Sequence, residues 1–232
     1  MNILLLMMGG SGTRYGADIP KQFVLVQGVP IFAYILEKYG RMPEIDHIIS
    51  VSHGEWVDYV REWGEKLGVK KLNCVVAGGS TRSGSVKNGL EAASRIASDG
   101  DVILIHDATH PYVDIEGTLE VIKAVRSCGG ATLGELQYDT VYRMDENLEI
   151  CEVVPRREIV AGASPEAFLF ELIYPVYANA DDEELERMTS AGAIALAHHI
   201  PMKVIPTDLI NLKITRKPDM AAFKKLLTDY YF

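Results

Sequence analysis

The sequence predicts an α/β fold: a Rossmann-like, doubly wound and mostly parallel sheet with a projecting β-hairpin arm. Short apolar runs suited to buried strands alternate with segments whose apolar residues recur at helical spacing. Two of these runs, 3–8 and 72–77, end in glycine loops. Two strands joined by only a short turn, 139–144 and 148–154, predict the arm. Because ligands bind at the carboxyl ends of strands in open α/β sheets, both loops are expected to face a ligand.

The first strand and the loop after it favour a triphosphate site. The run Ile3–Met8 has no charged residue and ends at Gly9-Gly10-Ser11-Gly12, which is typical of a buried central strand. Glycine N–H groups are unhindered and can bind phosphate oxygens, and Arg14 and Lys21 add two cations. The spacing disfavours a P-loop ATPase and a dinucleotide dehydrogenase. The glycines alone fit a simple turn equally well, and the cations favour phosphate.

The remaining elements follow from apolar spacing and turn residues. Helices are expected at residues 30–39, 56–66, 82–93, 114–125 and 165–177, from residue 181, and from residue 217. Further strands are expected at 45–51, 102–105, 132–136 and 202–205. Since a two-stranded hairpin is only marginally stable alone, the arm at 138–158 is expected to pack on a second subunit and form a homodimer.

A second glycine loop and an acidic strand end strengthen the prediction of a ligand site. Gly78-Gly79-Ser80 leads into a helix that begins near Arg82 and contains Ser85. The strand at 102–105 is followed by His106-Asp107. Mg²⁺ prefers one or two carboxylates plus phosphate oxygens, so Asp107 is a candidate contact for a metal-bound triphosphate. A turn or helix-cap role is the alternative for Asp107. The two histidines of this segment, His106 and His110, lack the spacing of a zinc site.

Length, charge and cysteine content limit the possible functions. A chain of 232 residues can bury a large core, and a single domain, 1–232, is expected. The net charge of −9 argues against non-specific nucleic-acid binding. Cys74, Cys128 and Cys151 follow no metal or disulfide pattern, so reduced thiols and a cytoplasmic location are expected. The apolar N-terminal run is too short to span a membrane.

An ordered series of motifs resembles the cytidylyltransferases of small polyol phosphates, which include a ribitol-5-phosphate branch and a 2-C-methyl-D-erythritol 4-phosphate branch. The motifs cover nearly the whole chain: Gly9-Gly10-Ser11-Gly12-Thr13-Arg14, Pro20-Lys21-Gln22-Phe23, Gly78-Gly79-x-x-Arg82-x-x-Ser85, His106-Asp107-Ala108-x-x-Pro111, Asp139-Thr140, Arg156 and Asn211-Leu212-Lys213-Ile214-Thr215. The resemblance implies a nucleotide-diphospho-sugar transferase-like fold. The Gly9-Gly10 pair and segment 53–57 are similar to the ribitol branch, which is therefore favoured.

The resemblance also implies a reaction and a site. A cytidylyl group would pass from CTP to a small polyol phosphate, with Mg²⁺ on the side of Asp107. The catalytic residues would be Arg14, Lys21, Arg156 and Lys213. The nucleotide would be bound by Met7, Met8, Gly9, Gly10, Ser11, Gly12, Gly78, Gly79, Ser80, Arg82, Ser85, His106 and Asp107. The acceptor would be bound by Thr140, Thr189, Lys213 and Arg156, or by the adjacent Arg157 in place of Arg156.

Departures from the family pattern all lie on the acceptor side. An arginine of the family is His110 here, its Gln-Thr-Pro-Gln is Ala163-Ser164-Pro165-Glu166, and its Thr-Asp pair is Thr189-Ser190. The triphosphate-side motifs are intact, so the departures concern the acceptor. A methylerythritol-phosphate enzyme, a sugar-1-phosphate nucleotidyltransferase and a non-catalytic nucleotide-binding protein are the alternatives.

Overall fold

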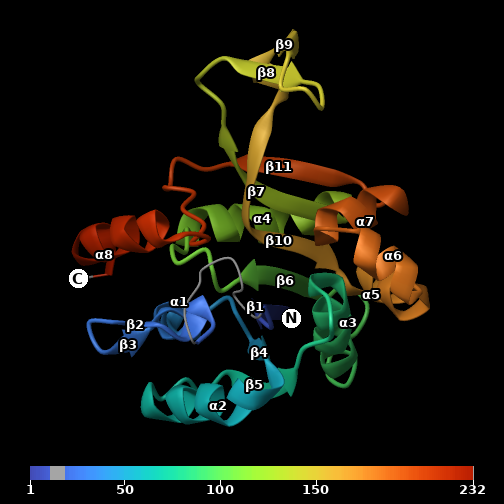
Figure 1. Ribbon diagram of the computed structural model, residues 1–232. Helices are drawn as coiled ribbons and strands as arrows, with labels where there is room; N and C mark the ends of the chain where they lie inside the picture. The colour runs from blue at the N-terminus through green and yellow to red at the C-terminus, as the bar shows by residue number, and fades with distance from the viewer. Residues whose placement is uncertain (11–18, 232) are drawn as a thin grey trace.

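The computed structural model describes residues 1–10 and 19–231 and contains a seven-stranded sheet with helices on both faces (Figure 1). The strands of this sheet are β1 (Asn2–Met8), β4 (His47–Ser52), β5 (Leu72–Ala77), β6 (Val102–Asp107), β7 (Gly130–Leu136), β10 (Val160–Leu169) and β11 (Met202–Pro206). Their order is β11-β7-β10-β6-β1-β4-β5. β10 is antiparallel to β6 and β7, and the remaining pairs are parallel. The predicted mostly parallel α/β fold is confirmed.

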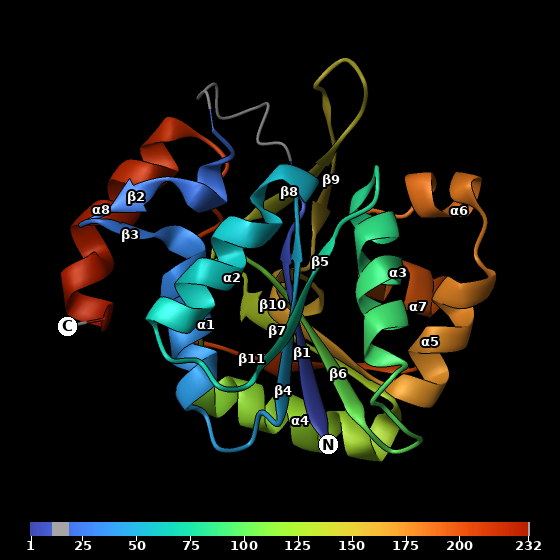
Figure 2. The same cartoon turned by 90° about the horizontal axis from the view of Figure 1, so that it is seen from below.

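β1 lies inside the sheet, and its apolar side chains alternate between two helical layers. Ile3, Leu5 and Met7 belong to a core with helices α3 (Arg82–Ala93), α5 (Phe170–Asn179) and α7 (Ala191–Ala197). The side chains between them, those of Leu4, Leu6 and Met8, pack with α1 (Ile31–Arg41), α2 (Val57–Lys66) and α4 (Ile115–Cys128) on the other face (Figure 2). Both faces of β1 are therefore covered, which explains its uninterrupted apolar sequence.

A third apolar cluster joins the two ends of the chain. Helix α8 (Lys217–Tyr231) packs against the small hairpin β2 (Leu25–Val26)–β3 (Val29–Pro30) and against the start of α1. Ile214 is fully buried in this cluster, so the packing of α8 fixes the chain immediately after Lys213.

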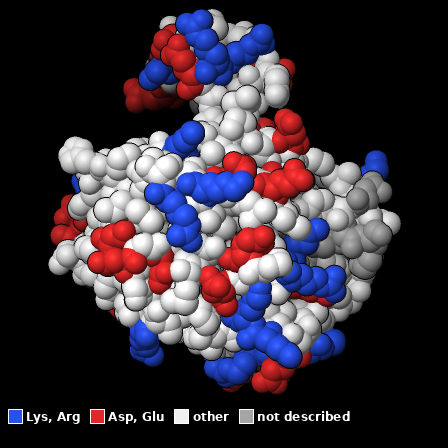
Figure 3. Space-filling view, turned by 180° about the vertical axis from the view of Figure 1, so that it is seen from behind, with Lys and Arg blue, Asp and Glu red and all other residues white. Residues whose placement is uncertain are grey.

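The arm is a hairpin of β8 (Val141–Met144) and β9 (Ile150–Val154) that projects from the sheet between β7 and β10 (Figure 1). Several of its apolar side chains are more than half exposed, namely Tyr138, Tyr142, Met144, Leu148, Ile150 and Val153. On the face shown in Figure 3, acidic and basic side chains are interspersed, and the head of the arm carries both signs. Among the described residues, none of the helices has the length and apolar composition to cross a membrane.

Two expected helices differ from the structure. The helix expected at 165–177 is wrong in its first part, because residues 165–169 belong to β10 and α5 begins only at Phe170. Pairing with a distant strand decides this: Glu166–Leu169 align antiparallel with residues 105–102 of β6. The helix expected from residue 181 is two helices, α6 (Asp182–Arg187) and α7, and a new side-chain cap at Ser190 begins the second.

Candidate active site

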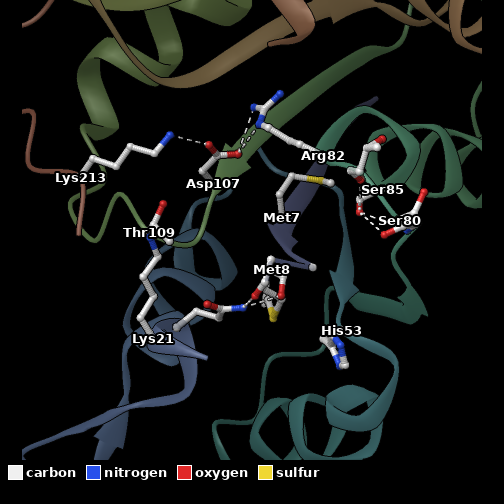
Figure 4. A pocket seen from close by; sticks show the side chains of 15 residues that line it. Met7, Met8, Lys21, His53, Ser80, Arg82, Ser85, Asp107, Thr109 and Lys213 are labelled. Atoms are coloured by element: carbon white, nitrogen blue, oxygen red, sulfur yellow. Dashed lines mark hydrogen bonds and ion pairs between the residues drawn. The ribbon is translucent and has the colours of Figure 1, made fainter. Parts of the chain in front are cut away.

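A cleft of about 480 Å³ opens where β1, β4, β5 and β6 end (Figure 4). It therefore lies at the carboxyl ends of parallel strands, as expected for a ligand site in such a sheet. The residues that line it are Met7, Met8, Gly9, Gly10, Lys21, Gln22, His53, Gly79, Ser80, Thr81, Arg82, Ser85, Asp107, Thr109 and Lys213.

The Pro-Lys-Gln-Phe motif holds the start of the first glycine loop and presents Lys21 to the cleft. The Gln22 amide donates hydrogen bonds of 2.8 Å to the carbonyls of Met8 and Gly10. Phe23 is buried and stacks on Trp56 with ring centroids 4.4 Å apart. The residues after Lys21 are thus anchored to the loop and to the core, and Lys21 lines the cleft beside them.

The two glycine loops meet at Ser85, in α3. A Cβ atom at Gly9 or at Gly78 would lie only 2.9 or 2.7 Å from the Ser85 hydroxyl oxygen. At Gly79 a Cβ atom would meet the backbone of Gly84 at 2.8 Å. These glycines are therefore required by close packing between the loops and α3. Gly10 differs, because a Cβ atom there would meet no atom of the described residues within 4 Å.

Asp107 is held between two cations from distant parts of the chain. Arg82 donates to Asp107 Oδ1 from Nε at 3.2 Å and from Nη2 at 3.0 Å, and Lys213 Nζ lies 3.1 Å from Oδ2. Figure 4 shows the two side chains approaching the carboxylate from opposite sides. The backbone carries these groups to one point: Asp107 ends β6, Arg82 begins α3, and Lys213 precedes the buried Ile214, whose N–H donates to the Thr109 carbonyl at 2.8 Å.

This arrangement keeps Asp107 and Arg82 charged at neutral pH. Burial favours the neutral form of Asp107, but Arg82 and Lys213 outweigh it and hold the pKa of the carboxyl well below its usual range. Burial opposes the charge of Arg82 as well, but the carboxylates of Asp107 and Glu166 outweigh this effect and raise the pKa of Arg82. The cleft is thus lined by Lys21, Arg82 and Lys213 as cations and by one carboxylate, which suits a strongly anionic ligand.

His106 belongs to β6, and its side chain is not among the residues that line the cleft, so its expected role in nucleotide binding stays a prediction. The side chain is fully buried, and its Nε2 lies 2.8 Å from the His110 carbonyl. A carbonyl only accepts, so Nε2 carries the proton and Nδ1 accepts from the Tyr39 hydroxyl at 2.9 Å. Burial lowers the pKa of His106 to about 4. His106 is therefore a neutral residue that holds the loop after β6.

Other expected site residues lie apart from the cleft or outside the described residues. Ser11, Gly12 and Arg14 are outside the described residues. Gly78 packs against Ser85 behind the lining residues. Thr140 and Arg156 belong to the arm, where the Arg156 guanidinium donates to the Tyr138 carbonyl. Thr189 lies between α6 and α7.

Four lining residues were not expected from the sequence as ligand contacts: Gln22, His53, Thr81 and Thr109. Gln22 and Thr109 stand within motifs that the sequence shows, next to Lys21 and two residues after Asp107. Thr81 is the N-cap of α3, where its hydroxyl accepts from the Gly84 N–H at 2.9 Å. His53 carries no local signal, because it reaches the cleft only by following β4, the neighbour of β1.

The residues present fit a magnesium ion that is bound mainly by the ligand. Among the described residues, no three His, Cys, Asp or Glu side chains converge to hold a metal on their own. Asp107 supplies a single anionic carboxylate within the cleft. Mg²⁺ commonly takes one or two carboxylates and completes its shell with phosphate oxygens and water. Asp107 is the described residue that suits this role.

In comparisons with known proteins, nearly the whole chain matches cytidylyltransferases of polyol phosphates. The family model described as IspD, 2-C-methyl-D-erythritol 4-phosphate cytidylyltransferase, matches residues 2–229. A ribitol-5-phosphate cytidylyltransferase of Streptococcus agalactiae is 30% identical over 227 residues, which cover 97% of this chain and 95% of that protein. A 2-C-methyl-D-erythritol 4-phosphate cytidylyltransferase of Thermotoga neapolitana is 33% identical over 232 residues, 99% of this chain and 98% of that protein.

The fold gives the same result. The crystal structure of 4-diphosphocytidyl-2C-methyl-D-erythritol synthase from Anaerococcus prevotii has a TM-score of 0.82 at 25% identity and covers 98% of this chain and 96% of its own. The glycine loops, the Pro-Lys-Gln-Phe element and the Asp107 cluster thus occur in a chain whose whole length matches one set of relatives. The chain belongs to the IspD family of cytidylyltransferases.

Proposed function

We propose that this chain transfers a cytidylyl group from CTP to a small polyol phosphate, most favourably ribitol 5-phosphate or a related alditol phosphate, and releases pyrophosphate. The observation that carries the proposal is the single cleft in which Lys21, Arg82 and Lys213 converge with two glycine loops. The similarity to ribitol-5-phosphate cytidylyltransferases over 97% of the chain supports this acceptor class.

The reaction needs charge neutralisation and alignment more than proton transfer. An oxygen of the acceptor phosphate forms a bond to the α-phosphorus of CTP. The bond from that phosphorus to the bridging oxygen breaks, and pyrophosphate leaves with the electron pair. Because the attacking oxygen is already anionic, no strong base is required. Lys21, with Arg14 by resemblance, stabilises the charge that builds up on the phosphates, and Lys213 orients the acceptor phosphate.

The hydrogen bonds of Ser85 support selection of cytosine over uracil. The Ser85 hydroxyl donates its proton to the Thr81 carbonyl at 2.9 Å and accepts from the Gly79 N–H at 3.1 Å. A hydroxyl has one proton and two lone pairs, so Ser85 retains an acceptor site and no donor. Cytosine presents an N4 amino donor where uracil presents an oxygen acceptor. CTP can therefore donate to Ser85 through N4, whereas UTP would have to displace the hydrogen bond from Ser85 to the Thr81 carbonyl.

Mg²⁺ completes the proposed site. It would be held by triphosphate oxygens and Asp107. When bound, it neutralises phosphate charge and orients the triphosphate. Arg82 and Lys213 keep the Asp107 carboxylate ionised and fix its direction.

The arm supports a homodimer in which a second copy completes the acceptor site. Tyr142 and Met144 alternate onto one face of the hairpin, where their cross-strand partners are Val153 and Ile150. All four side chains are more than half exposed, and a two-stranded hairpin gains stability from such a partner. In this dimer the arm of one copy would bring Thr140 and Arg156 to the acceptor of the other. The expected location is the cytoplasm, where CTP is available.

The test is pyrophosphate release with CTP and a panel of ribitol, erythritol, methylerythritol, glycerol and sugar phosphates. The proposal expects turnover with ribitol 5-phosphate or another alditol phosphate. Turnover only with UTP, dTTP or GTP and a sugar 1-phosphate would indicate the nucleotidyltransferase alternative. No turnover with any member would favour a non-catalytic nucleotide-binding protein.

A methylerythritol-phosphate acceptor is the second candidate. The relative from Thermotoga neapolitana, 33% identical over 99% of this chain, favours it. The same panel separates the two, since the better acceptor has the higher kcat/KM. Preference for methylerythritol phosphate would indicate synthesis of an isoprenoid precursor. Preference for ribitol 5-phosphate would indicate synthesis of a precursor for a ribitol-containing polymer such as teichoic acid.

A further inference from the structure

Glu166 connects the nucleotide and acceptor sides of the site, although it stands where the family pattern has a glutamine. It lies on β10, opposite Ile105 of β6 and Thr132 of β7. Because β10 is antiparallel to β6, its first part meets the carboxyl end of β6, next to Asp107. The Glu166 side chain is only 16% exposed.

Among the described residues, the partners of the Glu166 carboxylate are hydrogen-bond donors. Oε2 lies 3.4 Å from Arg82 Nη2 and accepts from the Ala191 N–H at 3.2 Å. Oε1 accepts from the Gly192 N–H at 2.9 Å. A Cβ atom at residue 192 would lie 2.9 Å from Oε1, so the glycine leaves room for this contact. A carboxylate can accept at both oxygens, whereas a glutamine would turn its NH₂ group toward one of these donors.

The same region of α3 holds, at a second point, residues 188–192, which contain Thr189, expected from the family resemblance to bind the acceptor. Ser83 Oγ donates to the Met188 carbonyl at 2.7 Å, immediately before Thr189. Residues 188–192 are therefore tied at one end to Ser83 and at the other to Glu166. Through Arg82, Glu166 is also tied to Asp107. This network runs from α7 through Glu166 and Arg82 to Asp107 and Lys213.

We infer that Glu166 is a positioning residue that sets the acceptor-side segment 188–192 relative to the Arg82–Asp107 pair. The inference rests on the proposed cytidylyl transfer, because positioning is assigned toward the acceptor of that reaction. The charge is essential to this role, since three donors converge on one carboxylate. Thr189 and Ser190 lie between the contact of Ser83 with Met188 and the contacts of Glu166 with Ala191 and Gly192, so these contacts determine their position.

The test compares Glu166→Gln with the wild type in the full-length protein, using CTP and an acceptor that the wild type turns over. In Glu166→Gln one of these donors would face an NH₂ group instead of an acceptor oxygen, so the KM for the acceptor substrate is expected to rise roughly 10-fold or more. The KM for CTP is expected to rise less than that for the acceptor, because on the nucleotide side only the 3.4 Å contact with Arg82 Nη2 is altered, whereas Ser85 and Lys21 do not contact Glu166. An unchanged acceptor KM, or equal losses for both substrates, would overturn the inference.

Glu171→Gln is the matched control. Glu171 is also a carboxylate that accepts from a backbone N–H, that of Gly100 at 2.9 Å, but it lies on α5 away from the cleft. A glutamine oxygen can keep this single bond, so both KM values are expected to stay at the wild-type level. In a double-mutant cycle, the KM for the acceptor is measured for Glu166→Gln, for Arg82→Met and for the double variant. The effects of the two substitutions should not be additive, because Glu166 acts through Arg82.

Amide hydrogen exchange provides a readout that does not depend on turnover. In Glu166→Gln, the amides of Ala191 and Gly192 are expected to exchange faster than in the wild type, and those of α6 are not. Unchanged exchange at Ala191 and Gly192 would refute the contact itself. If the wild type turned over no polyol phosphate, the proposed function would fail while the exchange result still tested the network.

Discussion

Lys21 shows how buried neighbours can place a side chain for which we propose a catalytic role. Gln22 and Phe23 are nearly inaccessible to solvent, and they fix the short helical turn that carries Lys21. Gln22 is bonded to the first glycine loop itself, so the cation and the loop keep their relative positions. The preorganised charge needs no rearrangement when phosphate charge develops.

Replacement of Lys21 should therefore affect the chemical step and not the fold. Lys21→Ala is expected to lower kcat by about 10²–10³-fold, as is typical when a donor aimed at transition-state charge is removed. Steady-state pyrophosphate release measures this, and the thermal unfolding midpoint should stay unchanged. Lys123→Ala, which removes an exposed lysine paired with Glu120, is the control. A Lys21→Ala enzyme with near-normal turnover would remove Lys21 from the mechanism.

Gly78 tests the packing between the two glycine loops. In Gly78→Ala the new Cβ would lie 2.7 Å from Ser85 Oγ, so the hydroxyl must move and its hydrogen bonds with Thr81 and Gly79 weaken. Urea unfolding should show a loss of about 1–3 kcal/mol, typical of overpacking, together with a higher KM for CTP. Gly10→Ala, where the added Cβ meets no atom of residues 1–10 or 19–231 within 4 Å, should leave the unfolding free energy unchanged. Equal stability of the two variants would contradict this account.

At the scale of elements, the antiparallel strand β10 determines how the acceptor side is built. It brings Ser164 and Glu166 to the end of β6, where the Asp107 N–H lies 3.4 Å from the Ser164 hydroxyl oxygen. The same strand leads directly out of the arm. The arm and the acceptor side of the cleft are therefore consecutive in the chain.

Elements that depend on neighbouring residues in the sequence could be predicted. Elements that depend on pairing with a distant strand could not. The apolar run 3–8, its glycine loop and the hairpin can be predicted without knowledge of the rest of the chain. Residues 165–169 fit a helical pattern equally well, and only their alignment with β6 makes them a strand. The contact of Glu166 with α7 depends on that alignment and could not be predicted. The core position of His106 was missed because its partner Tyr39 is 67 residues away.

The apolar face of the arm gives a prediction about assembly. The double variant Tyr142→Ser with Met144→Ser should dissociate the proposed homodimer, which sedimentation velocity would detect. Turnover of the polyol phosphate should fall while CTP binding is retained, because the arm of the second copy is proposed to complete the acceptor site. Arg143→Ser is the control, since Arg143 pairs with Glu152 on the other face of the hairpin. A wild-type monomer with full activity would contradict the dimer.

At the scale of the whole molecule, the buried His106 and the half-buried His110 link stability to pH. Burial lowers the pKa of His106 to about 4, and burial with the nearby charge of Lys213 lowers that of His110 to about 3. An unfolded histidine titrates near pH ~6.5. Between that pH and about 4 the unfolded chain binds more protons than the folded one, so stability falls on acidification. The lowered pKa of Asp107 affects stability only at lower pH, below the pKa that an aspartate has in the unfolded chain, ~3.9.

The expected loss from pH 7 to pH 5 is roughly 3 kcal/mol for the two histidines together. Urea unfolding at pH 7, 6 and 5 measures it. His106→Asn should be less stable at pH 7 and should show about half the dependence on pH. A free energy of unfolding that does not change between pH 7 and pH 5 would show that these side chains are not buried as neutral groups.

The cleft takes its walls from both ends of the chain, and this has a consequence for synthesis on the ribosome. The strands β1, β4, β5 and β6, with both glycine loops and Asp107, are complete by residue 107. Lys213 comes much later, and the buried Ile214 beside it packs against α8, the last element. A nascent chain that has reached residue 107 therefore already carries both glycine loops and Asp107, but it lacks the cation that faces Arg82 across this carboxylate. The cluster of three charges can form only after residue 213 and the segment that anchors it have been synthesised.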